Sequence, residues 1–208
     1  LQVLIHLDHI LHDADAELLS WDLSRFSSIM YDASRLPFDE NIRRTARFVA
    51  DKGHLLLVEG ACDEIADSGS ASSELTTADK AERYYKETGV DTIVANLGTE
   101  HRASVSELRY AGEHARKIKE RIGNKLVLHG GSSVDGEAMA HLADDGICKV
   151  NVWTLLEREA SGALFEHMVR NASRVAGTSV VQRLKLEELL GSRSASEGAA
   201  SLAYCSTA

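Results

Sequence analysis

Short apolar runs alternate along the chain with longer segments in which apolar residues recur at helical spacing. This alternation is typical of βα units, in which each strand is followed by a helix that packs on a parallel sheet. The apolar runs predict six strands, at residues 2–7, 27–31, 55–59, 91–97, 125–129 and 147–152. The other segments predict six helices, at residues 14–21, 38–52, 77–88, 104–122, 134–144 and 154–176.

Residues that favour helix ends support these boundaries. Thr77 precedes the acidic Asp79, as at many helix N-termini, and Gly53, Gly89 and Gly123 follow predicted helix ends. The strands are almost continuously apolar, as expected for a parallel sheet that is covered on both faces. The pattern therefore predicts an α/β fold, and it fits a closed β/α barrel and an open doubly wound sheet equally well.

The chain has 208 residues, near the upper range for one compact domain, and 44% of them are hydrophobic, enough for a sizeable core. We expect residues 1–176 to form one domain of six βα units. Residues 177–208 predict a C-terminal helix followed by a flexible tail, because the end of the chain is rich in Ser, Ala and Gly. The long polar segment 61–76 is typical of loops that move or bind a ligand.

The composition excludes several classes of protein. A formal net charge of −9 without a basic patch argues against a nucleic-acid partner, because phosphate chains are bound by clustered Lys and Arg. No run of 18 apolar residues predicts a membrane span. The three cysteines form no C-x-x-C pair and are odd in number, so we expect no disulfide framework and a reducing, cytoplasmic location.

Three of the nine histidines follow predicted strands, and they are His9, His101 and His129. In a β/α barrel the C-terminal ends of the strands meet at one mouth, so these side chains would lie together. A single histidine at a strand end is more often a hydrogen-bonded core residue, but three at one mouth suit zinc. With a fourth position left to water or substrate, they predict an open, catalytic type of site. The other histidines are expected at the surface, and His6 is expected to point away from Asp8.

Asp8 directly precedes His9 at the same strand end. Its carboxylate would act as a general acid if burial raised its pKa, or it would only orient a metal ligand. Two further stretches follow the last two strands, Gly130-Gly131-Ser132-Ser133 and Asn151-Val152-Trp153-Thr154. Loops in this place frequently bind phosphate in β/α barrels, although a Gly-Gly-Ser stretch also makes plain turns.

Ordered motifs from about Val3 to Thr154 resemble the class II, zinc-dependent ketose-bisphosphate aldolase family, which includes the fructose- and tagatose-bisphosphate enzymes. The motifs are His6-Leu7-Asp8-His9, Ser28-Ile29-Met30-Tyr31-Asp32-Ala33-Ser34, Pro37-Phe38-Asp39-Glu40-Asn41, Val58-Glu59, Thr88-Gly89-Val90-Asp91, Gly98-Thr99-Glu100-His101, Leu126-Val127-Leu128-His129-Gly130-Gly131-Ser132 and Lys149-Val150-Asn151-Val152.

The resemblance implies a TIM-type (β/α)8 barrel and a retro-aldol reaction that yields dihydroxyacetone phosphate and an aldehyde. Zinc would act as the Lewis acid on the ketose carbonyl. The residue roles implied are zinc ligands at His9, His101 and His129, proton exchange with the departing aldehyde oxygen at Asp8, phosphate contacts at Gly130, Gly131, Ser132, Asn151 and Thr154, and a second metal at Asp32 with Glu59. We also expect Val152 and Trp153, within the second stretch, to contact the substrate.

Some positions depart from the family pattern. Arg102 stands where the family usually has Gly, Ala61 replaces a second Glu, and Trp153 replaces an acidic or small residue. The loop after Ala61 lacks the usual Gly-Gly-x-Glu, so Glu64 and Glu74 are the candidates for its acid. These departures leave open an aldolase-like barrel with an altered substrate.

The family also has two βα units before the His-x-Asp-His strand, and we expect these first two units to be missing from this chain. A six-stranded portion cannot close an eight-stranded barrel by itself. The chain would then be a fragment, or a partner would complete the barrel, and a homo-oligomer is expected. A non-catalytic member that binds a sugar phosphate or supports a partner subunit is the remaining alternative.

Overall fold

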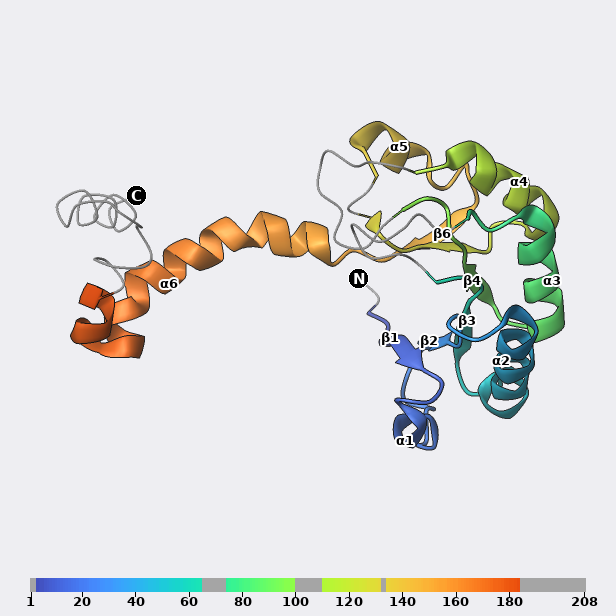
Figure 1. Cartoon of the computed structure of the whole chain (residues 1–208), viewed down its shortest axis with the longest axis horizontal. Helices are drawn as coiled ribbons and strands as arrows, with labels where there is room; N and C mark the ends of the chain where they lie inside the picture. Colours follow the sequence, from blue (N-terminus) through green and yellow to red (C-terminus); the bar gives the residue numbers. More distant parts are fainter. Residues whose placement is uncertain (1–2, 65–73, 100–109, 132–133, 184–208) are drawn as a thin grey trace. The chain divides into compact units, whose positions relative to one another are not determined.

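The computed structural model describes residues 3–64, 74–99, 110–131 and 134–183, of which 155, 158 and 172–183 are described by their backbone alone. Strands and helices alternate through this part of the chain (Figure 1). The strands are β1 (His6–Leu11), β2 (Ser28–Asp32), β3 (Leu57–Ala61), β4 (Thr92–Val94), β5 (Leu126–Leu128) and β6 (Ile147–Val150). The helices are α1 (Ala16–Leu19), α2 (Phe38–Lys52), α3 (Ala78–Thr88), α4 (Gly112–Ile122), α5 (Gly136–His141) and α6 (Thr154–Arg183).

The six strands form one parallel sheet in the order β1-β2-β3-β4-β5-β6. Each strand therefore lies beside its neighbours in the sequence, and the sheet curls as part of a barrel does. The prediction of a parallel α/β fold is confirmed. Sequential order distinguishes this sheet from a doubly wound one, in which the strand order reverses.

The two faces of the sheet carry different side chains because successive residues of a strand point to opposite sides. Ile29, Ile93 and Leu126 belong to the main hydrophobic core, which includes Phe48 of α2 and Ile118 of α4. On the other face a small cluster gathers from four adjacent strands, and its members are Met30, Ala61, Val94 and Val127. The polar side chains of the candidate site share this second face.

Helix α3 packs closely on β3. A Cβ at Gly60 would lie 2.8 Å from Tyr84 Oη and 2.9 Å from Val90 Cγ1, so only glycine fits there without displacement. The Tyr84 hydroxyl is buried and lies 3.2 Å from Thr45 Oγ1. This packing fixes β3 against the helices and so fixes the neighbouring Glu59 on the opposite face.

The predicted elements agree with the structure except at some ends. Helix α2 has the predicted bounds, while β4 is shorter than the predicted strand 91–97. The first strand is placed wrongly by the sequence pattern, because residues 3–5 are not in a strand and β1 runs from His6 to Leu11. Helix α4 begins at Gly112 and ends at Ile122 as predicted, while residues 104–109 of the predicted helix 104–122 lie outside the described residues.

The chain divides into two compact units, Leu1–Thr154 and Leu155–Ala208. All six strands lie in the first unit, together with every residue of the candidate site discussed below. Helix α6 lies in the second unit except for its first residue. The predicted domain boundary at residues 176 and 177 stays a prediction. Among the described residues, no helix combines the length and the apolar character needed to cross a membrane.

Candidate active site

A bulge in β1 brings Asp8 and His9 to the same face of the sheet. Leu7 pairs with Ile29 and Ile10 pairs with Tyr31, so two residues of β1 stand opposite one residue of β2. His9 has a φ of 50°, in the left-handed region that non-glycine residues seldom adopt. The expectation that His9 follows the end of a strand is therefore wrong: it lies inside β1, at the bulge.

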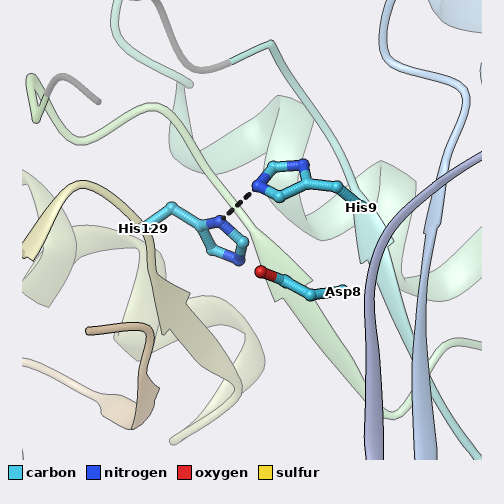
Figure 2. A group of neighbouring side chains, drawn as sticks. All are labelled: Asp8, His9 and His129. Carbon is cyan, nitrogen blue, oxygen red and sulfur yellow. Dashed lines mark hydrogen bonds between the residues drawn. The ribbon is translucent and has the colours of Figure 1, made fainter. Parts of the chain in front are cut away.

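His129 lies directly after β5, as predicted, and its side chain is buried. Figure 2 shows its ring facing His9 and Asp8, with His129 Nδ1 3.1 Å from His9 Nε2. The two rings are nearly perpendicular, with centroids 4.8 Å apart. Asp8, His9 and His129 each offer one potential ligand atom, and these three atoms lie within 4.8 Å of one another.

Each of the two histidines has a carboxylate beside its other ring nitrogen. His129 Nε2 lies 3.0 Å from Glu59 Oε1, and His9 Nδ1 lies 3.6 Å from Asp32 Oδ2. A carboxylate in this position holds a proton on the nitrogen that it faces and directs the opposite lone pair to a metal ion. Asp32 also raises the pKa of His9 above its ordinary value of 6.5.

The donor set fits a metal ion. Two imidazole nitrogens bound to one tetrahedral zinc ion at about 2.05 Å are separated by about 3.3 Å. The observed separation of 3.1 Å between His9 Nε2 and His129 Nδ1 is close to this value. The site is thus a candidate metal centre built from strands β1 and β5.

Asp8 stays ionised at neutral pH, whereas a role as a general acid would require burial to raise its pKa. Burial alone would raise the pKa of the carboxyl group, but His6 and the charges of His9 and His129 together lower it to about 2. Asn151 Nδ2 donates a hydrogen bond of 2.9 Å to Asp8 Oδ1 and lies 3.0 Å from His129 Nε2. In the protein without substrate, Asp8 is therefore poised to accept a proton rather than to donate one.

Lys149 and His6 extend the site and were not predicted as part of it. Lys149 Nζ donates a hydrogen bond of 2.6 Å to Glu59 Oε2 and lies 3.1 Å from His6 Nε2. The expectation that His6 points away from Asp8 is wrong, because His6 Nε2 lies 3.6 Å from Asp8 Oδ1. Residues two apart in a strand share a face, and this spacing was the signal that could have placed His6.

Glu59 is a buried carboxylate with both oxygens engaged. Burial acts to raise its pKa, but the hydrogen bond from His129 and the ammonium of Lys149 outweigh that effect, so the pKa lies below the ordinary value. A second group that could hold a metal ion consists of His6, Asp8 and Glu59. Asp32 belongs to neither of these groups of described residues, and a second metal at Asp32 with Glu59 stays a prediction.

The two stretches predicted to bind phosphate follow β5 and β6. Gly130 and Gly131 are buried, and a Cβ at Gly131 would lie 3.1 Å from the carbonyl oxygen of Asn151, so the two stretches touch. Beyond Asn151, the side chains of Val152 and Trp153 are exposed, and Thr154 is the first residue of α6. His101 and Ser132 lie outside the described residues, so their places in the site stay predictions.

The candidate loop acids lie at the ends of the segment that begins after β3. Glu64 is exposed and forms an ion pair with Arg35 at 3.3 Å. The carbonyl oxygen of Glu74 accepts a hydrogen bond from Asn96. Neither contact involves the histidines of the site, and the choice between these acids stays open.

The sequence profile described as fructose-bisphosphate aldolase class-II matches residues 1–192 of this chain. The chain belongs to this family. A fructose-bisphosphate aldolase of Giardia intestinalis (strain ATCC 50803 / WB clone C6) is 30% identical over 201 aligned positions, which cover 83% of this chain. The match covers 62% of that relative, so the chain spans about three fifths of the length of the curated relative.

Solved structures of aldolases have the same fold. The YdjI aldolase from Escherichia coli K12 matches with a TM-score of 0.54 and 24% identity over 78% of this chain and 60% of that chain. Fructose-bisphosphate aldolase from Campylobacter jejuni matches with a TM-score of 0.61 and 19% identity over 85% of this chain and 58% of that chain. The resemblance of the motifs to class II aldolases is thus confirmed, and the chain is a divergent member of the family.

Proposed function

We propose that this chain supplies the active site of a zinc-dependent aldolase that cleaves or forms a carbon–carbon bond of a phosphorylated ketose. The products of cleavage would be dihydroxyacetone phosphate and an aldehyde. The observation that carries the proposal is the approach of His9 Nε2 to His129 Nδ1 at 3.1 Å, with Asp8 beside both rings. Membership of the class-II aldolase family supports the reaction type.

His9 and His129 would hold the zinc ion together with His101. When bound, zinc polarises the ketose carbonyl and so stabilises the negative charge that develops as the bond breaks. The carboxylates of Glu59 and Asp32 would keep the two described imidazoles in the orientation that a metal ligand needs.

Asp8 would exchange the proton of the reacting hydroxyl. In the cleavage direction its carboxylate accepts the proton from the hydroxyl that becomes the aldehyde oxygen, because its pKa of about 2 keeps it ionised. In the reverse direction the protonated carboxyl returns that proton. The Asn151 amide holds Asp8 Oδ1 at 2.9 Å and so orients the carboxylate for both steps.

The substrate phosphate would bind beyond His129. The candidate contacts are the backbone N–H groups of Gly130, Gly131 and Ser132 and the stretch that leads into α6, Asn151, Val152, Trp153 and Thr154. The described sheet would provide six strands of a TIM-type barrel, whose mouth gathers these loops, and we expect the assembled enzyme to be a cytoplasmic homo-oligomer.

Metal removal tests the proposal. The purified protein is treated with a chelator, dialysed, and assayed for cleavage of a ketose bisphosphate before and after zinc is added back. Cleavage should disappear on chelation and return with zinc. Equal activity of the treated and untreated protein would overturn the proposal.

An altered substrate is the second candidate, and Trp153 favours it. The indole is 72% exposed two residues beyond Asn151, where a bulky apolar ring would meet a bound molecule. Turnover of a sugar bisphosphate and of its dephosphorylated analogue separates the two candidates. A phosphate site predicts much faster turnover of the bisphosphate, whereas equal rates would favour a substrate without phosphate.

A further inference from the structure

A line of polar contacts crosses the inner face of the sheet behind the candidate metal ligands. Ser28 Oγ lies 2.8 Å from His6 Nδ1, and His6 Nε2 lies 3.1 Å from Lys149 Nζ. The ammonium in turn donates to Glu59 Oε2, and Glu59 Oε1 faces His129 Nε2 at 3.0 Å. Strands β1, β2, β3 and β6 and the residue just after β5 are thereby joined by contacts between side chains.

The chemistry of Lys149 determines the direction of these contacts. An ammonium group only donates hydrogen bonds, so His6 Nε2 accepts and the proton of His6 sits on Nδ1, from which it is donated to Ser28. A carboxylate paired with an ammonium only accepts, so His129 Nε2 donates to Glu59. The Nδ1 atom of His129 is then the nitrogen that presents a lone pair toward His9.

We propose that Lys149 is a positioning residue for the metal centre. By binding Glu59 Oε2 and His6 Nε2 at once, it fixes the Glu59 carboxylate so that the other oxygen holds the proton on His129 Nε2. The ring nitrogen that His129 offers to the metal is thus selected by a lysine that does not touch the metal. The inference rests on the proposed function, since it takes His9 and His129 as ligands of one ion.

The burial of Glu59 and His129 makes their contacts with each other and with Lys149 hard to replace. The Glu59 side chain is 3% exposed and that of His129 is 1% exposed, so water cannot readily replace a lost partner at either group. Lys149 also supplies the positive charge that the buried carboxylate needs, because an unpaired buried charge is strongly unfavourable. A neutral side chain at position 149 would leave the carboxylate without the contact that sets its rotation.

The test uses the full chain with the variants Lys149→Met and Lys149→Arg. Lys80→Met is the matched control, because Lys80 also pairs with a carboxylate, that of Asp63, and its side chain has nearly the same exposure as Lys149, 34% against 33%. Zinc affinity is measured by competition with a chromophoric chelator. The tautomer of His129 in the metal-free protein is read from the ¹⁵N chemical shifts of its ring, assigned by their loss in His129→Gln.

We expect the wild type to carry the proton of His129 on Nε2. In Lys149→Met both tautomers should appear and zinc affinity should fall by about 10- to 100-fold, the range found for groups that orient metal ligands. Lys149→Arg should restore most of the affinity, because it keeps a charged donor. Lys80→Met should leave both quantities unchanged.

Unchanged tautomer and zinc affinity in Lys149→Met would overturn the inference, as would an equal loss of affinity in Lys80→Met. If Lys149→Met does not fold, as judged by circular dichroism, Lys149→Gln takes its place. The wild type alone also tests the proposal, because a proton on Nδ1 of His129 in the metal-free protein would contradict it. A wild type that lacks aldolase activity but shows the expected tautomer would refute the proposed function and leave the role of Lys149 standing.

Discussion

His9 Nε2 and His129 Nδ1 lie 3.1 Å apart although 120 positions separate the two residues in the sequence. The approach follows from the curl of a parallel sheet, which brings a residue of β1 and a residue just after β5 to the same face. The carboxylates of Asp32 and Glu59 stand behind the two rings. The candidate metal centre therefore combines ligands from β1 and from the residue just after β5 with orienting carboxylates from β2 and β3.

Removal of either imidazole should abolish metal binding. In His9→Ala and His129→Ala we expect zinc affinity to fall by more than the 10- to 100-fold typical of groups that only orient ligands. His141→Ala is the control, because His141 lies on α5 with an exposed side chain. Isothermal titration calorimetry measures the affinity, and near-normal zinc binding by His9→Ala would exclude His9 as a ligand.

Substitution of Asp8 separates proton transfer from metal binding. Asp8→Asn keeps the shape of the side chain but removes the group that accepts the proton, so kcat should fall by about 10²- to 10⁴-fold. Zinc affinity should change little. Both are measured on the same preparation, by steady-state kinetics and by chelator competition. A loss of zinc affinity as large as that in His9→Ala would instead identify Asp8 as a metal ligand.

Metal binding should weaken as the pH falls through the raised pKa of His9, because a protonated imidazole cannot bind a metal ion. The midpoint is expected above 6.5, since Asp32 raises this pKa. Asp32→Asn should move the midpoint to lower pH. In the metal-free protein, the stability contributed by this contact depends on pH in the opposite direction. The His9–Asp32 contact contributes stability below pH 6.5, and that stability is lost as the pH rises through the raised pKa.

The control for this pH profile is Asp144→Asn. Asp144 Oδ2 also lies 3.6 Å from a histidine, His141, but both side chains are exposed and neither belongs to the groups of described residues that could hold a metal ion. Zinc affinity measured between about pH 5 and 9, across the titration range of histidine, should give the wild-type profile for this control. A profile of Asp32→Asn that coincides with that of the wild type would contradict the role of Asp32.

Gly131→Ala should disturb the contact between the two candidate phosphate stretches. The new Cβ would lie 3.1 Å from the carbonyl oxygen of Asn151, so that segment must move by a few tenths of an ångström. We expect KM for a sugar bisphosphate to rise and stability to fall by about 1–3 kcal/mol, as in other overpacked sites. Gly136→Ala, where a Cβ meets nothing within 4 Å, should leave KM unchanged. Equal KM values for the two variants would argue against binding of phosphate at Gly131.

Much of the fold follows from the periodicity of the sequence. Helix α2 was predicted with its observed bounds because its apolar positions, such as Ile42 and Phe48, keep helical spacing between a proline and a glycine. The pairing of His9 and His129 followed from the rule that the C-terminal ends of parallel strands meet. The predicted position of His9 after a strand end was wrong, because β1 continues past it. The bulge there adds one residue and so interrupts the regular alternation of side chains between the two faces.

The contacts of Lys149 could not be derived from the spacing of histidines. Its signal in the sequence was a charged residue inside the otherwise uncharged strand Ile147–Val150. Glu59 gave the same signal in β3. A buried glutamate and a half-buried lysine on different strands of one sheet are expected to pair, because a buried carboxylate is unfavourable without a partner. Only the curl of the sheet shows that both lie behind His129.

The backbone of His9 shows that the fold gives up stability in order to keep this side chain in place. With φ at 50°, a histidine is held in a conformation that costs on the order of 1–3 kcal/mol and that glycine adopts freely. Selection for stability alone would favour glycine at this position. The imidazole at position 9 is thus held in place at a cost in folding free energy, as expected where a side chain serves the chemistry of a site rather than the stability of the fold.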